Sequence, residues 1–300
     1  MKRLVCCVAL FLMAPPVARA QELEPGAYWP LPVGMNILTV VNVNSRGDMT
    51  FDPSLPIDHA SAWINSTVGV YTRTLSLWGR STNASAQFPL LVGHVEGNYL
   101  GVPTEVDRFG QGDPRFRIAV NLYGAPSMAP RAFGTYRIRT LVGVSLTVAP
   151  PLGQYDSAQL INIGANRWSI KPELGFARAT GPWVIELMAG AWFFTLNDAF
   201  GGNGTRSQQP IISSQAHLTY RFLSRNMWLA ADANFYLGGR TTVNGIIKED
   251  LQRNSRIGVT YSAALTPHHS IRASVSRGAI TRIGGDFTSI SAAYNYAWRK

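Results

Sequence analysis

Apolar and polar residues alternate along short segments of the chain, most regularly from residue 115 onward. In the segment 136–148, the even-numbered positions include Ile138 and Val142, whereas the odd-numbered positions include Arg137 and Arg139. A period of two is typical of a β-strand whose two faces meet different surroundings. Helical spacing is not sustained in any long segment. The pattern therefore predicts an all-β protein.

This alternation predicts a series of strands along most of the chain. The clearest cover residues 115–122, 136–148, 167–176, 183–193, 212–222, 229–237, 256–265, 271–276 and 289–298. Weaker alternation predicts further strands at 36–44, 60–72 and 77–95, and Pro89 is expected to kink the last of these. The total is about 12, an even number that returns both chain ends to the same side of a membrane barrel.

The connections between these segments differ in length. Tight turns are expected at 180–182, 223–226 and 266–269, and long loops rich in Gly and Asn at 149–166, 197–209 and 238–253. Outer-membrane barrels combine short periplasmic turns with long outer loops. The fold prediction is therefore a transmembrane, up-and-down antiparallel β-barrel. The alternative is a large soluble all-β protein whose apolar faces pack together, but that fold would not sort its loops by length.

Composition favours the membrane barrel. Charged residues make up only 15% of the chain, against roughly 25% in an ordinary soluble domain. Four tryptophans, Trp168, Trp183, Trp228 and Trp298, fall at the ends of expected strands. Aromatic side chains are enriched where a membrane meets water. The shortage of charge is therefore explained by a wall that faces lipid.

Residues 1–20 have the pattern of a secretory signal peptide, with a basic start, an apolar run and small residues before the cleavage site. Cleavage after Ala20 would leave residues 21–300 as a single barrel domain. It would also remove Cys6 and Cys7, so the exported protein would hold neither a disulfide nor a thiolate metal site. The sequence predicts no cofactor.

The exported chain is basic. Removing three basic residues with the signal peptide lowers the formal net charge from +10 to +7. Export argues against nucleic acid as a partner. We expect membrane lipid and lipopolysaccharide to be partners instead, with Arg277 near outer phosphates and Arg178 near inner headgroups. The sequence does not indicate an oligomeric state.

One face of the strands is expected to line a lumen, because the apolar face of a membrane barrel points to lipid. The candidate lining residues are Arg117, Arg137, Arg139, Arg167, Lys171, Glu173, Glu186, His217, Arg221, Asp232, Arg256 and Arg272. Positive charge dominates, which favours small anionic solutes such as aromatic carboxylates. The alternative, given equal weight, is that these arginines pair with the three carboxylates and brace the wall.

A segment in the middle of the chain resembles a known family. Residues 148–177 contain Pro-Pro-x-Gly-x-Tyr-Asp, then Asn-x-Gly-x-Asn-Arg-Trp, then Lys-Pro-Glu-Leu-Gly. This combination resembles the outer-membrane proteins associated with meta-pathway phenol degradation. The resemblance implies a barrel that transports small solutes in organisms that degrade aromatic compounds. One departure is that Arg299 and Lys300 follow Trp298, whereas such barrels usually end on an aromatic residue.

The function expected from these observations is passive diffusion of small aromatic or hydrophobic solutes, including anions, through a narrow channel. A structural or surface-interaction barrel is the nearest alternative. A lipase is a distant third, because the chain has only five histidines and His217 lies about 13 Å along a strand from Ser213. No catalytic residue and no metal site is predicted, since neither a nucleophile elbow nor a set of three metal ligands is present.

Overall fold

The computed structural model describes residues 23–51, 57–159, 161–222 and 226–299. The expected signal peptide and its cleavage site lie outside these residues. The strands are β1 (Met35–Thr50), β2 (Ile57–Leu77), β3 (Arg80–Tyr99), β4 (Val102–Gln111), β5 (Arg115–Tyr123), β6 (Thr140–Ala149), β7 (Ser169–Thr180), β8 (Trp183–Phe194), β9 (Asn197–Phe200), β10 (Gly204–Gln208), β11 (Ile211–Phe222), β12 (Met227–Gly238), β13 (Thr241–Val243), β14 (Ile246–Ile247), β15 (Gln252–Ala264), β16 (His269–Ile280) and β17 (Gly284–Arg299). The helix α1 is one turn, Pro130–Phe133.

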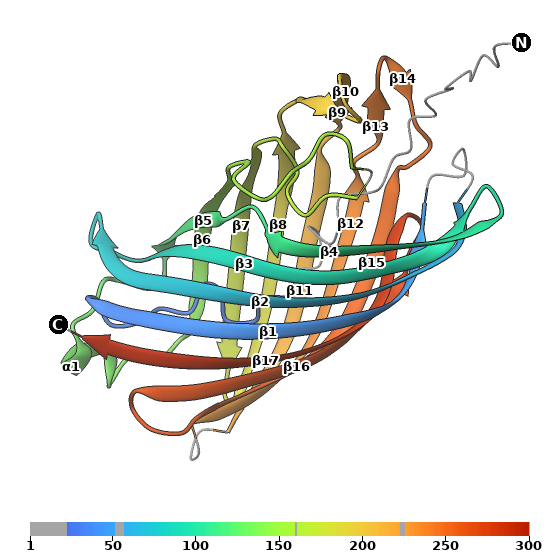
Figure 1. The fold of residues 1–300 in the computed structure, drawn as a ribbon. Helices are drawn as coiled ribbons and strands as arrows, with labels where there is room; N and C mark the ends of the chain where they lie inside the picture. The colour runs from blue at the N-terminus through green and yellow to red at the C-terminus, as the bar shows by residue number, and fades with distance from the viewer. Residues whose placement is uncertain (1–22, 52–56, 160, 223–225, 300) are drawn as a thin grey trace, which may run out of the picture.

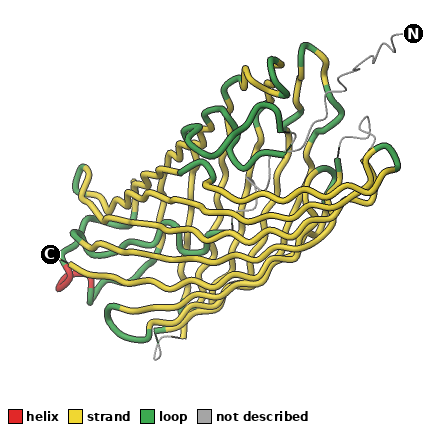
Figure 2. The backbone as a smooth tube through the Cα atoms, in the orientation of Figure 1, coloured by secondary structure: helices red, strands yellow, loops and turns green. Residues whose placement is uncertain are grey.

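Thirteen strands form one antiparallel sheet, which closes because β2 pairs with β1 on one side and with β3 on the other. β4 and β5 lie end to end along β3, so the closed wall is twelve strands around. Figures 1 and 2 show the resulting barrel, with the expected up-and-down order. Met35 is opposite Arg299, so both ends of the barrel chain lie at one rim, which we call the periplasmic end.

Pro89 marks the point where β3 changes partner. β3 pairs with β5 up to Gln87 and with β4 from Leu90. Proline has no N–H to donate to a ladder, and it is therefore tolerated at such a discontinuity. The carbonyl of Pro89 accepts a hydrogen bond from the N–H of Gly112, in the gap between β4 and β5. The expected kink in β3 is therefore not the consequence of Pro89; instead, the strand that pairs with β3 is interrupted there, between β4 and β5.

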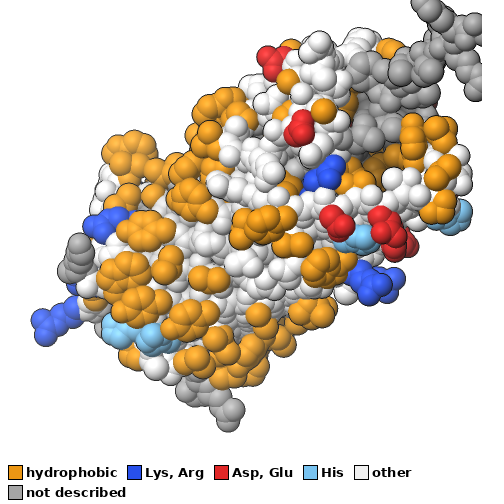
Figure 3. All heavy atoms as spheres, in the orientation of Figure 1, with side chains coloured by type: hydrophobic (Ala, Val, Ile, Leu, Met, Phe, Trp, Pro, Cys, Tyr) orange, Lys and Arg blue, Asp and Glu red, His pale blue; other side chains and the backbone are white. Residues whose placement is uncertain are grey.

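The alternation seen in the sequence is an alternation of burial. Along β7, every second side chain is exposed, including Ile170, Leu174 and Phe176, while those between are buried. Figure 3 shows apolar side chains spread over the outside of the barrel, with few charges among them. Such an exterior is stable in hydrocarbon and costly in water. The chain is an outer-membrane β-barrel.

β1 and β2 depart from this rule. Their inward faces carry Val41, Val43, Val68 and Val70, which are half-buried. On the outward face, Asn42 donates from Nδ2 to Asn65 Oδ1 at 2.9 Å and to Thr67 Oγ1 at 3.0 Å, so that these polar groups satisfy one another. Apolar residues on the inward face and polar residues on the outward face explain why the alternation at 36–44 and 60–72 is weak in the sequence.

Several boundaries expected from the sequence are wrong. The segment 77–95 is not one strand, because Leu77 ends β2 and a turn at Trp78 and Gly79, both with positive φ, precedes β3. Residues 136–139 precede β6 and belong to a long periplasmic connection that includes α1. Conversely, the outer connection between β16 and β17 is short. Loop length therefore follows the expected rule only in part.

Two expected long loops form a second, smaller sheet at the outer end, in the order β14-β13-β10-β9. It stands above the barrel in Figure 1. β13 and β14 are joined by Asn244 and Gly245, both with positive φ, which is the usual chemistry of a two-residue hairpin turn. The side chain of Asn244 accepts a hydrogen bond from the N–H of Thr205 on β10. We call this sheet, together with residues 150–159 and 161–168, the cap.

Candidate functional site: the barrel lumen

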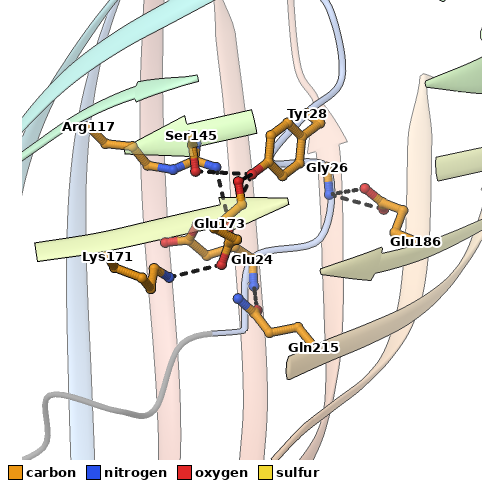
Figure 4. A network of polar contacts seen from close by, with 9 residues as sticks. All are labelled: Glu24, Gly26, Tyr28, Arg117, Ser145, Lys171, Glu173, Glu186 and Gln215. Carbon is orange, nitrogen blue, oxygen red and sulfur yellow. Dashed lines mark hydrogen bonds and ion pairs between the residues drawn. The ribbon is translucent and has the colours of Figure 1, made fainter. Parts of the chain in front are cut away.

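The lumen contains the chain that precedes β1. Residues 23–34, which we call the N-terminal segment, lie partly inside the barrel, where Figure 4 shows Glu24, Gly26 and Tyr28. The segment reaches the periplasmic end at Gly34, whose N–H donates to the carbonyl of Thr74. The N–H of Glu24 donates to Gln215 Oε1 at 3.1 Å. The N–H of Gly26 donates to both carboxylate oxygens of Glu186, each at 3.1 Å. The segment is therefore attached to β8 and β11 by hydrogen bonds to its backbone.

Tyr28 is the most deeply buried side chain of the segment, with 2% of its surface exposed. Its ring lies over Gly143 and Gly175, where an added Cβ would come within 2.4 Å and 2.2 Å of ring atoms. Its hydroxyl contacts Ser145 Oγ at 3.0 Å and Glu173 Oε1 at 3.1 Å. Two glycines that face each other on β6 and β7 thus create the space for this ring.

Glu173 is the centre of a buried charged cluster beside Tyr28 (Figure 4). Lys171 Nζ lies 3.0 Å from one carboxylate oxygen of Glu173, and Arg117 lies 3.5 Å from the other. The guanidinium of Arg117 also lies 5.1 Å from the ring centre of Tyr28. These distances support the bracing role that the sequence left open for the charged residues of β5 and β7.

A second polar group crosses β11, β12 and β15. His217 Nδ1 lies 2.6 Å from Asp232 Oδ1, and Thr260 Oγ1 donates to Asp232 Oδ2 at 2.6 Å. His217 is also opposite Glu186 in the strand register, so this group adjoins the attachment of the N-terminal segment. His217 Nε2 has no hydrogen-bond partner within the described part of the chain.

Cations in the outer part of the barrel lie over aromatic rings. Arg115 and Lys171 approach the ring of Trp192, at 5.9 and 5.3 Å from its centre. Arg167 lies 4.4 Å from the ring centre of Phe194. Each pairing places a guanidinium or an ammonium group against the electron-rich face of an aromatic ring. The result is a wall of cations and rings along β5, β7 and β8.

The opposite half of the lumen is less filled. Most inward side chains on β7, β8 and β11 are buried, whereas inward positions in the middle of β16, β17, β1 and β2, such as Ser274, Ala293, Val41 and Val68, are half-buried. Arg272 on β16 is exposed to this space, with its guanidinium 5.3 Å from the ring centre of Trp228. Trp228 packs against Trp29 of the N-terminal segment, so it faces the lumen and not the membrane interface expected from the sequence.

The outer end of the lumen is closed by apolar side chains. These form one buried cluster, the outer apolar cluster: Met49, Phe51, Ala60, Ala62, Ile64, Val95, Phe200, Val243 and Phe287. An apolar pocket lies beside it, between β2, β3 and the cap. Arg108 closes one side of this pocket by donating from Nε to the carbonyl of Ile161 at 2.6 Å.

The twelve candidate lining residues fall into two groups. Within the barrel and buried are Arg117, Arg167, Lys171, Glu173, Glu186, His217, Asp232 and Arg256, and Arg272 faces the open half. At the periplasmic rim are Arg137, Arg139 and Arg221. Arg137 donates to the carbonyl oxygens of Gly134 and Tyr136, and Arg221 to that of Gly181.

Periodicity along the chain gives no sign of the N-terminal segment or of the outer apolar cluster. The inward glycines Gly143 and Gly175 are the one sequence signal for the N-terminal segment. Two small residues opposite each other on an inward face leave room for a large side chain from elsewhere in the chain. Most of the family motif in residues 148–177 lies in the cap, and the rest lies on β7. Tyr155 donates its hydroxyl to the carbonyl of Ala199, and Asn166 Nδ2 donates to Asn197 Oδ1. Arg167 donates to Gln208.

Two features are absent from the part of the chain that the structure describes. No group of three or more His, Cys, Asp or Glu side chains there could hold a metal ion. No helix there has the length and apolarity needed to cross a bilayer.

Comparison with known proteins gives a family and a fold. Residues 44–290 match the family described as "Putative MetA-pathway of phenol degradation". No curated protein matches the chain. The barrel is similar to the COG4313 outer membrane channel from Pseudomonas putida F1, with a TM-score of 0.76 and 20% identity over 92% of this chain and 100% of that one. It is also similar to the β domain of the Bordetella autotransporter BrkA, with a TM-score of 0.52 and 13% identity over 88% and 99%.

Proposed function

We propose that this chain, which belongs to the phenol-degradation MetA-pathway family, is an outer-membrane channel for small aromatic or hydrophobic solutes, including anions, that diffuse passively through a narrow lumen. The observation that carries the proposal is that the two sides of the lumen differ in chemistry. β1 and β2 present valines inward, whereas β5, β7 and β8 present cations and rings. A solute with an apolar body and a carboxylate finds a complementary surface on each side.

The apolar side gives the body of such a solute a place to bind. Val41 and Val43 on β1 and Val68 and Val70 on β2 point into the open half of the lumen, with Val41 directly opposite Val68, and all four are half-buried. Burial of apolar surface contributes about 25 cal/mol per Å². The outer apolar cluster and its neighbouring pocket extend this surface toward the outside.

Arg272 on β16, in the same open half of the lumen as the valines, gives an anionic group a place to bind. Arg272 reaches the open half of the lumen and lies against Trp228. A guanidinium can pair with a carboxylate through two parallel hydrogen bonds and can stack on an aromatic ring. Arg117 and Lys171, by contrast, are engaged with Glu173. Arg272 is therefore the residue that we assign to anion preference.

A barrel without transport is the second candidate, and a specific observation favours it. The N-terminal segment lies in the lumen, bonded to Glu186 on β8 and Glu173 on β7, and an apolar cluster joins the cap to the wall at the outer end. Both features would also stabilise a barrel whose role is structural. In that case the valines of β1 and β2 would simply line a residual space.

Flux into proteoliposomes separates the two candidates. Uptake of ionised benzoate is compared with that of acetate, which carries the same charge on a smaller apolar body. A channel of the proposed kind takes up benzoate faster than acetate, and protein-free liposomes take up neither at a comparable rate. Equal, negligible uptake with and without protein would favour the structural barrel.

A further inference from the structure

The outer apolar cluster joins two parts of the molecule that are far apart around the barrel. Ile64, Val95 and Phe287 face inward from the wall strands β2, β3 and β17. Phe200 and Val243 come from the cap, on β9 and β13. All nine members of the cluster are at most 9% exposed, so the contact is dry.

The order of the strands shows that this contact crosses the lumen. β9 and β10 connect β8 to β11, and β13 and β14 connect β12 to β15. β8, β11 and β12 lie across the closed sheet from β2 and β1. The small sheet therefore rises from one side of the barrel and places Phe200 and Val243 against the other side. The apolar contact therefore spans the outer mouth of the barrel.

The cap is held in this position by polar contacts outside the cluster. The N–H of Gln154 donates to the carbonyl of Gln111, the last residue of β4, at 2.8 Å. The hydroxyl of Tyr155 donates to the carbonyl of Ala199 on β9, at 3.1 Å. These contacts join the small sheet to the wall independently of the apolar side chains. Substitutions in the cluster can therefore alter the contact without releasing the cap.

We propose that Phe200 and Val243, which lie in one apolar cluster with Ile64, Val95 and Phe287, form a hydrophobic seal that determines specificity by passing solutes with an apolar body faster than small hydrated ions. This inference deepens the proposed channel function and rests on it. A hydrated ion finds no polar group in the seal to replace its water, and apolar constrictions of this kind slow the passage of ions by excluding water. An apolar solute replaces the contacts between the cap and the wall with contacts of its own, so it can pass.

The seal and the N-terminal segment are held in the barrel by different interactions. The segment is attached by hydrogen bonds to Glu186 and Gln215 and leaves half of the lumen open. The seal has no such polar attachment among its own side chains and lies above that opening.

A cysteine placed beneath the seal tests the proposal directly. Residues 21–300 contain no cysteine, so Ser66→Cys, two residues below Ile64 on the inward face of β2, would introduce a single thiol. Intact cells are treated from outside with a permanently charged thiosulfonate reagent. The wild-type seal should make modification slow, and the double substitution Phe200→Ser and Val243→Ser should accelerate it at least severalfold. The paired substitution Ile246→Ser and Ile247→Ser, at exposed positions of the same sheet, is the control and should leave the rate unchanged.

Benzoate flux into proteoliposomes is measured on the same variants. The seal is confirmed if ion access rises while benzoate flux persists, so that the preference for the aromatic solute falls. Equal modification rates in wild-type and double-serine proteins would overturn the seal, even if benzoate still crossed. If the wild-type barrel passed no aromatic solute, the channel function would fail, whatever the thiol accessibility showed. Heat-modifiable mobility on gels reports whether each variant is folded.

Discussion

The N–H of Gly26 donates to both carboxylate oxygens of Glu186, at 3.1 Å each, and so joins the N-terminal segment to the barrel wall. A hydrogen bond to a charged acceptor contributes about 2 kcal/mol. This contact lies next to the His217 and Asp232 pair, at one level of the lumen. Attachment of the segment therefore depends on a small number of contacts, and each can be removed separately.

Glu186→Ala should loosen the N-terminal segment and raise the single-channel conductance, because Gly26 loses its acceptor. Glu186→Gln is the matched control, since an amide keeps one carbonyl oxygen for the same N–H and should change conductance less. Planar bilayer recording checks both. If the alanine variant conducted like the wild type, the contact would have no part in occluding the lumen.

Gly175→Ala should displace the ring of Tyr28, because the new Cβ would lie 2.2 Å from a ring atom. We expect the segment to leave its site, with higher conductance and faster proteolysis of residues 23–34 in the purified barrel. Gly69→Ala is the control, since no atom lies within 4 Å of its added Cβ. Identical proteolysis of the two variants would contradict the placement of Tyr28.

Glu173→Ala should destabilise the barrel, because it removes a carboxylate shared by Lys171 and Arg117. Removing one partner from a buried ion pair costs about 3 kcal/mol. The temperature at which the folded band disappears on gels should fall. Glu105→Ala, an exposed carboxylate on β4, should leave that temperature close to the wild-type value. A similar shift in both variants would show that the charged cluster does not brace the wall.

Arg272→Gln should lower the preference of the channel for anions, because it removes a positive charge from the open half of the lumen while keeping a polar side chain. Arg277→Gln, on the outward face of the same strand, is the control and should not change ion selectivity. The reversal potential in a gradient of potassium chloride measures the change. An unchanged reversal potential in the Arg272 variant would remove this residue from the anion path.

The sequence predicts most of the wall because lipid imposes a simple rule. On β7, Ile170 and Leu174 face outward while Lys171 and Glu173, which lie between them in the sequence, are buried, so the alternation is clear. On β1, Val41 faces inward while Asn42 faces outward, so the same rule gives a weak signal.

The interior could be predicted only in part, because its contacts are long-range. Tyr28 reaches Glu173, 145 positions away along the chain, from a segment without any strand pattern. Phe200 lies in an expected loop, and no local periodicity marks its contact across the lumen. The charged residues could be assigned to the inward face, but whether each pairs or remains accessible depends on neighbours from other strands. Arg117 and Arg272 differ in this way.

The most direct test of the channel is the reversal potential of single wild-type channels with sodium benzoate on one side and sodium acetate on the other. The two anions carry the same charge and differ in the apolar body, which the valines of β1 and β2 should bind. We predict resolved current steps and a reversal potential that shows higher permeability for benzoate than for acetate. Absence of current steps, selectivity for sodium, or equal permeability of the two anions would contradict the account.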